Sequence, residues 1–240
     1  MFCDADDMFY NACGLYILCR EIDNGGFDAL VSVFIEESRH PETKEPLYIN
    51  HDMDSTFVHG KVYRRKYLIN NNIRFNDNLT IHEDSYFNCL AQKCCSEVKY
   101  CPTSFYLWKW RDTSVCRHDP KYILKTYNNM LESNTELVKE LLDRRKEDDA
   151  KFYATSMIYD AYFTMNKDEW INQENKIYRD KTEKRFKKYY LEFKDLFDSV
   201  DEKIKSQIIV GVKNRFFNEG LFMESITFND WIEKVMELED

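Results

Sequence analysis

Hydrophobic and polar positions follow two patterns along this 240-residue chain. In the first half, apolar residues at helical spacing predict an amphipathic helix over residues 8–23, which the turn signal Asn-Gly-Gly at 24–26 ends. Residues 27–37 and 99–110 are rich in aromatic or β-branched residues and predict strands. The polar, proline-containing stretch 37–54 between them predicts a long surface loop, and such loops often carry function.

The block from residue 57 to residue 90 contains further predicted elements. A small-residue turn leads into a basic patch, and residues 73–75 predict a short strand. Glu83 and Asp84 predict the start of a helix, because acidic side chains in the first turn interact favourably with the helix dipole.

Beyond residue 119 the pattern becomes helical, with dense charge on the faces opposite the apolar ones. Four helices are expected, over residues 121–145, 148–166, 184–197 and 201–217. The sequence therefore predicts an α/β protein with a mixed sheet in a domain at 1–118 and a helical region at 119–240.

Composition narrows the class of protein. A hydrophobic content of 43% indicates a folded chain, and a net charge of −9 disfavours a nucleic-acid binder, which needs a basic surface. No apolar run reaches the length of a transmembrane segment, and no signal peptide is visible. The eight cysteines lack the paired spacing of a zinc site, so free thiols in the reducing cytoplasm are expected.

The strongest candidate site is the acidic run Asp4, Asp6 and Asp7, which directly follows the apolar residues 1–3. This pattern predicts a buried strand that ends at a divalent-metal site, because Mg²⁺ and Mn²⁺ prefer carboxylate oxygens. The alternative is an acidic cap on the helix that follows. A cap needs only one carboxylate, whereas three adjacent ones repel unless a cation neutralises them.

Glu83 and Asp84 form a second acidic pair. They can be plain helix-capping residues, or one of them can act as a general base toward a hydroxyl group. His82 beside them is a candidate for orienting the base, although a single loop histidine often has no role.

The run His59-Gly60-Lys61 allows close approach of the backbone to a ligand, with a cation available for phosphate. The alternative for Lys61 and the arginines that follow is a solvated basic strand edge. Further along the chain, Trp108 and Arg111 lie near the end of a predicted strand. An aromatic residue there could stack on a sugar, although aromatic residues of this kind usually lie in a core.

Several of these pieces resemble one family when taken in order. They are DADD at 4–7, GKVYRRKYL at 60–68, NIRF at 72–75, HEDSYF at 82–87 and YLWKWRDTSV at 106–115. Their order and spacing resemble the family 2 glycosyltransferases of the GT-A fold, a Rossmann-like architecture. The resemblance covers residues 1–118, about half of the chain.

The resemblance implies roles for these residues. Asp4 and Asp6 would hold Mn²⁺ or Mg²⁺ with Asp7 nearby, and Asp84 would be the catalytic base with Glu83 as its acidic companion. Lys61 and Arg111 would contact phosphate or the acceptor, and His59 and Trp108 are further candidates for substrate binding from the residues themselves. The implied reaction is inverting transfer of a sugar from a nucleotide-diphosphate donor to a glycan or other hydroxyl acceptor.

Members of this family begin with a βαβ half that binds the nucleotide and opens on a strand like VSIIIPxYN, which this sequence lacks. We therefore expect a GT-A-like sheet without its first strands, whose open edge could recruit a protein partner. The alternative function is an inactive remnant that serves as an interaction module or as one subunit of a split enzyme. A nucleotidyltransferase is disfavoured, because no glycine-rich phosphate loop is present.

Overall fold

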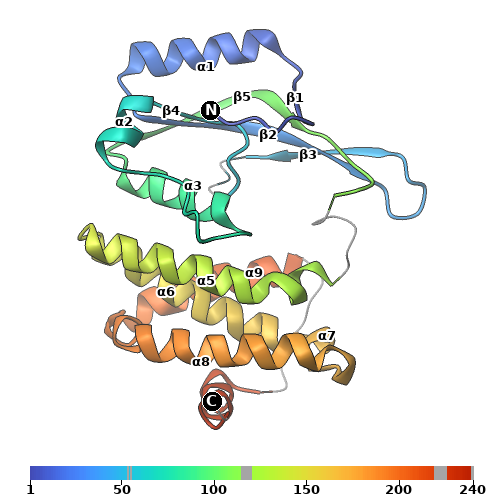
Figure 1. The fold of residues 1–240 in the computed structure, drawn as a ribbon, viewed down its shortest axis with the longest axis vertical. Coiled ribbons are helices and arrows are strands. Elements are labelled where there is room, and N and C mark those ends of the chain that lie inside the picture. Colours follow the sequence, from blue (N-terminus) through green and yellow to red (C-terminus); the bar gives the residue numbers. More distant parts are fainter. Residues whose placement is uncertain (53, 55, 115–120, 219–225, 239–240) are drawn as a thin grey trace. The chain divides into compact units, whose positions relative to one another are not determined.

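The computed structural model describes residues 1–52, 54, 56–114, 121–218 and 226–238. The chain forms two compact units, Met1–Asp119 and Pro120–Asp240 (Figure 1). The boundary predicted between residues 118 and 119, and the end of the last family-like run, lie outside the described residues.

The first unit is built on a five-stranded mixed sheet with the strand order β1-β5-β2-β3, in which β4 also pairs with β2. The strands are β1 (Met8–Phe9), β2 (Ala29–Arg39), β3 (Pro46–His51), β4 (Lys61–Tyr63) and β5 (Val98–Trp108). β2 and β5 run parallel, from Ala29 opposite Val98 to Glu36 opposite Trp108, and the other pairs are antiparallel. The predicted α/β class is thus confirmed.

Helix α1 (Ala12–Gly25) covers one face of this sheet (Figure 1). Leu18 and Ile22 of the helix pack against Phe34 and Phe105 of the two central strands. A Cβ at Gly14 would lie 2.6 Å from the Cβ of Phe105, so only glycine lets helix and strand approach this closely. The helix buries Leu18, one of the apolar positions that predicted it, but it begins at Ala12 and not at residue 8, because Met8 and Phe9 form β1.

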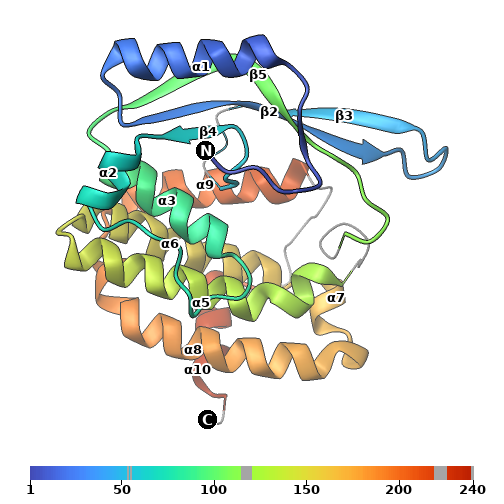
Figure 2. The ribbon, with the colours of Figure 1, turned by 45° about the horizontal axis from the view of Figure 1, so that its top comes forward.

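Helix α3 (Glu83–Cys94) lies on the opposite face of the sheet, with the short α2 (Arg65–Asn70) beside it (Figure 2). α3 begins at the predicted acidic pair. Phe87 stacks on Phe75 with ring centroids 4.3 Å apart, and Phe2 meets both rings edge-on at 5.2 Å. This contact brings the N-terminal segment to the first turns of α3.

Two strand predictions are wrong. Residues 1–3 form no strand, Met1 and Cys3 are exposed, and the strand β1 follows the acidic run instead of preceding it. Residues 73–75 are irregular, although Ile73 is buried and its N–H donates to the Leu68 carbonyl at 2.9 Å. In that second case the apolar pattern reflected burial and not strand pairing.

The predicted loop 37–54 is partly wrong as well, because it contains β3. This strand pairs with β2 from His51 opposite Phe34 to Pro46 opposite Arg39, and the resulting hairpin extends beyond α1 (Figure 2). Leu47, Tyr48 and Ile49 are all exposed, so β3 has no buried face that alternation could have indicated.

The second unit is helical, as predicted. Its helices are α5 (Tyr122–Asp143), α6 (Glu147–Met165), α7 (Asp168–Ile171), α8 (Lys176–Ser199), α9 (Glu202–Asn218) and α10 (Phe228–Met236), with a short 3-10 turn η1 (Gln173–Asn175). Asp160 is buried and accepts hydrogen bonds from the Tyr127 hydroxyl, at 2.7 Å, and from Arg215, which ties three of these helices together. None of the helices described in either unit is long and apolar enough to cross a membrane.

Candidate functional site

Three potential metal ligands meet in the first unit. Asp4, Asp7 and His59 each place a carboxylate oxygen or a ring nitrogen within 4.8 Å of the others. Asp4 and Asp7 belong to one turn, closed by the Asp7 N–H donating to the Asp4 carbonyl at 3.1 Å. In the part of the chain that the structure describes, this is the group of at least three aspartate, glutamate, histidine or cysteine side chains that lie close enough together to hold a metal ion.

Strand β5 holds the Asp7 carboxylate in place. The Tyr106 hydroxyl donates to Asp7 Oδ2 at 2.5 Å, and the Lys109 N–H donates to Asp7 Oδ1 at 3.0 Å. Burial raises the pKa of Tyr106, and its hydrogen bond to Asp7 raises it further, so the phenol stays protonated and remains a donor. A carboxylate oxygen has two lone pairs, so it can accept a hydrogen bond and bind a cation at the same time.

Asp6 has a different partner. Its carboxylate forms an ion pair with the guanidinium of Arg111, which follows β5 in the sequence. The structure therefore brings Asp7, and not Asp6, next to Asp4 and His59. The metal role of Asp6 and the substrate role of Arg111 stay predictions.

His59 lies among aromatic rings, and its residue is only 6% exposed. Its ring is 5.0 Å from that of Tyr106, 5.1 Å from Trp108 and 5.9 Å from Phe57, measured between centroids. Trp108 and Phe57 are half-buried and pack against the hydrophobic core of this unit. The role of Trp108 in stacking on a sugar stays a prediction.

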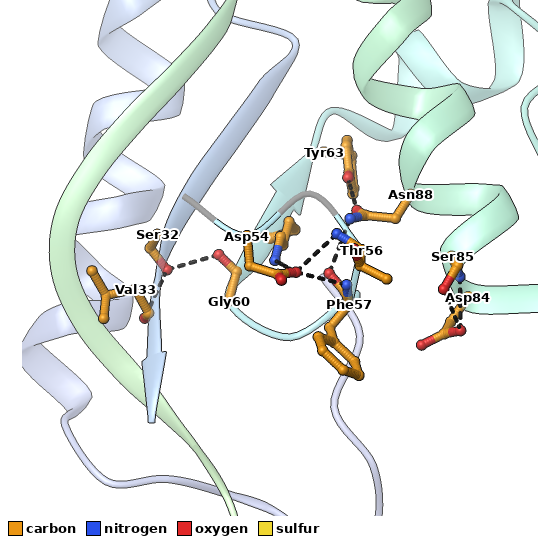
Figure 3. A network of polar contacts seen from close by, with 11 residues as sticks. Ser32, Val33, Asp54, Thr56, Phe57, Gly60, Tyr63, Asp84, Ser85 and Asn88 are labelled. Carbon is orange, nitrogen blue, oxygen red and sulfur yellow. Dashed lines mark hydrogen bonds and ion pairs between the residues drawn. The ribbon is translucent and has the colours of Figure 1, made fainter. Parts of the chain in front are cut away.

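The turn before β4 depends on Gly60, which has a φ of +70°. A Cβ there would lie 3.0 Å from the Ser32 carbonyl oxygen, and the Gly60 carbonyl accepts hydrogen bonds from the Ser32 N–H and hydroxyl, at 3.0 and 2.7 Å (Figure 3). Gly60 thus docks the turn on β2 and fixes the positions of His59 and Lys61 on either side of it.

Lys61 is fully buried, so it does not lie on a solvated strand edge. Its ammonium lies 3.4 Å from Asp54 Oδ1 and 5.2 Å from the centre of the Phe34 ring. The same Asp54 oxygen accepts the N–H groups of Thr56 and Phe57, both at 2.8 Å (Figure 3). Burial lowers the pKa of Lys61, and the carboxylates of Asp54 and Asp84 oppose that change.

The basic residue Arg64 has a structural role. Its side chain donates to the carbonyls of Ile22 and Phe27, at and just beyond the C-terminal turn of α1. A cation there interacts favourably with the helix dipole and caps exposed carbonyl groups.

Asp84 lies in the first turn of α3, next to Glu83. Burial raises the pKa of the Asp84 carboxyl and the negative charge of Asp4 adds to the rise, while the hydrogen bond from the Ser85 N–H, at 2.7 Å, opposes it (Figure 3). The edge-on contact of Phe2 with Phe87 brings the N-terminal segment that carries Asp4 to the helix that begins at the candidate base. His82 before it has a φ of +64°, and burial lowers its pKa.

Asn88, one turn further along α3, links the helix to the turn that carries His59. Its amide donates to the Phe57 carbonyl at 3.0 Å and its oxygen accepts from the Tyr63 hydroxyl (Figure 3). Asn88, Asp54 and Tyr106 were not predicted as site residues. The Asp-x-Thr spacing at 54–56 is a recognisable side-chain turn signal, whereas nothing local marks Asn88 or Tyr106.

A comparison with protein-family models and with curated proteins gives no match to this sequence. Solved structures of S. aureus TarS are similar in fold. For one, the TM-score is 0.56 at 14% sequence identity, covering 99% of this chain and 39% of that chain. For TarS 1–349 the TM-score is 0.54 at 14% identity, with coverages of 93% and 67%.

The structure of TarS 1–349 in complex with UDP gives a TM-score of 0.53 at 14% identity, with coverages of 95% and 69%. The present chain thus spans 39% of the TarS chain in the first of these structures. At this level of identity the similarity concerns the fold, and it shows that the chain has a glycosyltransferase-like fold.

Proposed function

We propose that this chain transfers a sugar from a nucleotide-diphosphate sugar to a hydroxyl group of a glycan or other acceptor. The observation that carries the proposal is the group of Asp4, Asp7 and His59 within a glycosyltransferase-like fold, with Asp84 on the helix whose Phe87 contacts Phe2 of the same N-terminal segment. A sugar transferase needs both a place for a diphosphate with its cation and a base for the acceptor, and these residues are the candidates for the two roles.

The donor half of the site would be held by Asp4 and Asp7. Their carboxylates suit Mn²⁺ or Mg²⁺, and a bound cation would neutralise the charge that develops on the leaving diphosphate. Tyr106 and the Lys109 N–H hold Asp7 in orientation. The UDP in one similar TarS structure supports a uridine diphosphate as the nucleotide part of the donor.

The acceptor half would be served by Asp84. Its carboxylate would take the proton from the acceptor hydroxyl as that oxygen attacks the anomeric carbon, which inverts the configuration there. A raised pKa suits this role, because it makes the carboxylate a stronger base than an ordinary surface aspartate. The half-buried rings of Trp108 and Phe57 could support the acceptor.

Donor binding tests this proposal directly. Thermal unfolding of the full chain is followed with a panel of nucleotide-diphosphate sugars, with and without Mn²⁺. A ligand at about 100 times its dissociation constant adds roughly 2.7 kcal/mol, which corresponds to an increase of roughly 5–10 °C in Tm for a chain of this size.

The expected result is a metal-dependent shift for at least one donor that Asp7→Ala abolishes. Asp77→Ala is the matched control, because Asp77 is an exposed aspartate in the same unit outside the candidate site. A panel without any shift in the wild type, or a shift that Asp7→Ala leaves unchanged, would contradict the proposal.

A further inference from the structure

The third member of the candidate metal group is a nitrogen donor. A ring nitrogen of His59 lies within 4.8 Å of a carboxylate oxygen of Asp4 and of Asp7. His59 comes from the turn before β4, more than 50 positions along the chain from the acidic run. Two independent segments thus converge on one point.

The His59 ring is also held firmly. It is stacked with the rings of Tyr106 and Phe57, with interplanar angles of 25° and 11°, and Trp108 packs against it. The backbone of its turn is fixed by the contacts of Gly60 with β2. A side chain restrained in this way loses little further conformational entropy when it binds a ligand.

We propose that His59 is a nitrogen ligand of the cation held by Asp4 and Asp7. This inference rests on the proposed function and adds a third protein ligand to its metal site. Mg²⁺ demands an octahedral shell of oxygen ligands, whereas imidazole is a common ligand of transition metals.

Electron paramagnetic resonance of Mn²⁺ with the full chain, with and without UDP, tests the inference. Loss of the free-ion signal measures binding, and electron spin-echo modulation of the bound ion detects a coordinated nitrogen. We expect ¹⁴N modulation in the wild type that changes to the ¹⁵N pattern in protein labelled with ¹⁵N-histidine. This labelling assigns the nitrogen to histidine without any mutation.

The variant His59→Gln is expected to lose the nitrogen modulation and to bind Mn²⁺ about 10- to 100-fold more weakly, the loss typical of perturbed metal sites. His40→Gln is the control, because His40 lies in the β2–β3 hairpin turn and accepts hydrogen bonds from backbone N–H groups there. It should keep the wild-type signal.

Bound Mn²⁺ without nitrogen modulation in the wild type would overturn the inference and leave the carboxylate site of the proposed function intact. A free-ion signal that the protein never reduces, with or without UDP, would overturn it as well. The donor-binding panel described above then decides separately whether the proposed function stands.

Discussion

The buried ion pair of Lys61 and Asp54 gives an asymmetric prediction for stability. The Lys61 side chain is 0% exposed, whereas that of Asp54 is 21% exposed. Asp54→Ala removes the carboxylate that neutralises a buried ammonium and also removes the acceptor of two backbone N–H groups. Leaving a charge buried without its partner costs about 3–5 kcal/mol, and we expect the free energy of unfolding to fall by that amount.

Replacing Lys61 should lower the free energy of unfolding by less than replacing Asp54 does. Lys61→Met removes the buried charge and fills its space, and Asp54 keeps both N–H donors and its contact with water. We expect a loss of about 1–2 kcal/mol, since replacing buried charge by apolar groups of similar volume is often nearly neutral. Adding Lys61→Met to Asp54→Ala should therefore recover part of the stability.

Urea unfolding followed by circular dichroism measures these differences, and hydrogen exchange of residues 54–63 shows whether they arise in this turn. A pH series gives an independent check. Burial lowers the pKa of Lys61 in the folded chain, so its charged form costs stability until the pH rises through that pKa. The deficit of Asp54→Ala should therefore shrink from pH 7 to more alkaline values. A loss in Lys61→Met that equals or exceeds that in Asp54→Ala would refute the reasoning.

Three other substitutions have defined outcomes. Asp84→Asn should lower turnover by about 10²–10⁴-fold without lowering stability at pH 7. In the wild type, kcat/KM should fall as the pH decreases, and the fall should begin at a higher pH than an ordinary aspartate would give, because burial raises the pKa of Asp84. Gly60→Ala should reduce the free energy of unfolding by more than Gly26→Ala does, as denaturant titration can measure. Both glycines have a positive φ, which costs a residue with a Cβ about 1–2 kcal/mol, but only at Gly60 would the new Cβ also meet backbone atoms. Tyr106→Phe removes the hydroxyl that holds Asp7, so Mn²⁺ affinity measured by paramagnetic resonance should fall about 10-fold, and unchanged affinity would exclude this positioning role.

The sequence predicted those elements whose signals are local. Acidic residues in the first turn placed the start of α3 at Glu83, and the β-branched run gave β2. The helical spacing beyond residue 119 gave the four long helices of the second unit. In β2 the apolar residues that define the strand also form its buried part.

Prediction failed where structure depends on a distant partner. β1 is two residues long and exists because Met8 and Phe9 pair with Leu107 and Tyr106 of β5. β3 is exposed on both faces and is defined by its pairing with β2 alone. Neither strand has a pattern of its own that could distinguish it from a loop.

The candidate site, like the fold, has one part that local sequence signals predict and another that depends on distant contacts. The two carboxylate-bearing segments were predicted from residue type and spacing. The grouping of Asp7 with His59, in place of Asp6, depends on which way the turn at 4–7 faces, and that is set by the hydrogen bonds of Asp7 to β5. No sequence pattern encodes such a contact between positions about 100 residues apart.

Release of UDP from UDP-sugars by the purified full chain, with and without Mn²⁺, tests the central claim most directly. The account predicts Mn²⁺-dependent release from at least one donor, with proton NMR showing that the sugar first released has the inverted anomeric configuration. Release should fall about 10²–10⁴-fold in Asp84→Asn and stay at the wild-type level in Asp77→Asn. No release from any donor, or equal release by the wild type and Asp84→Asn, would contradict the account.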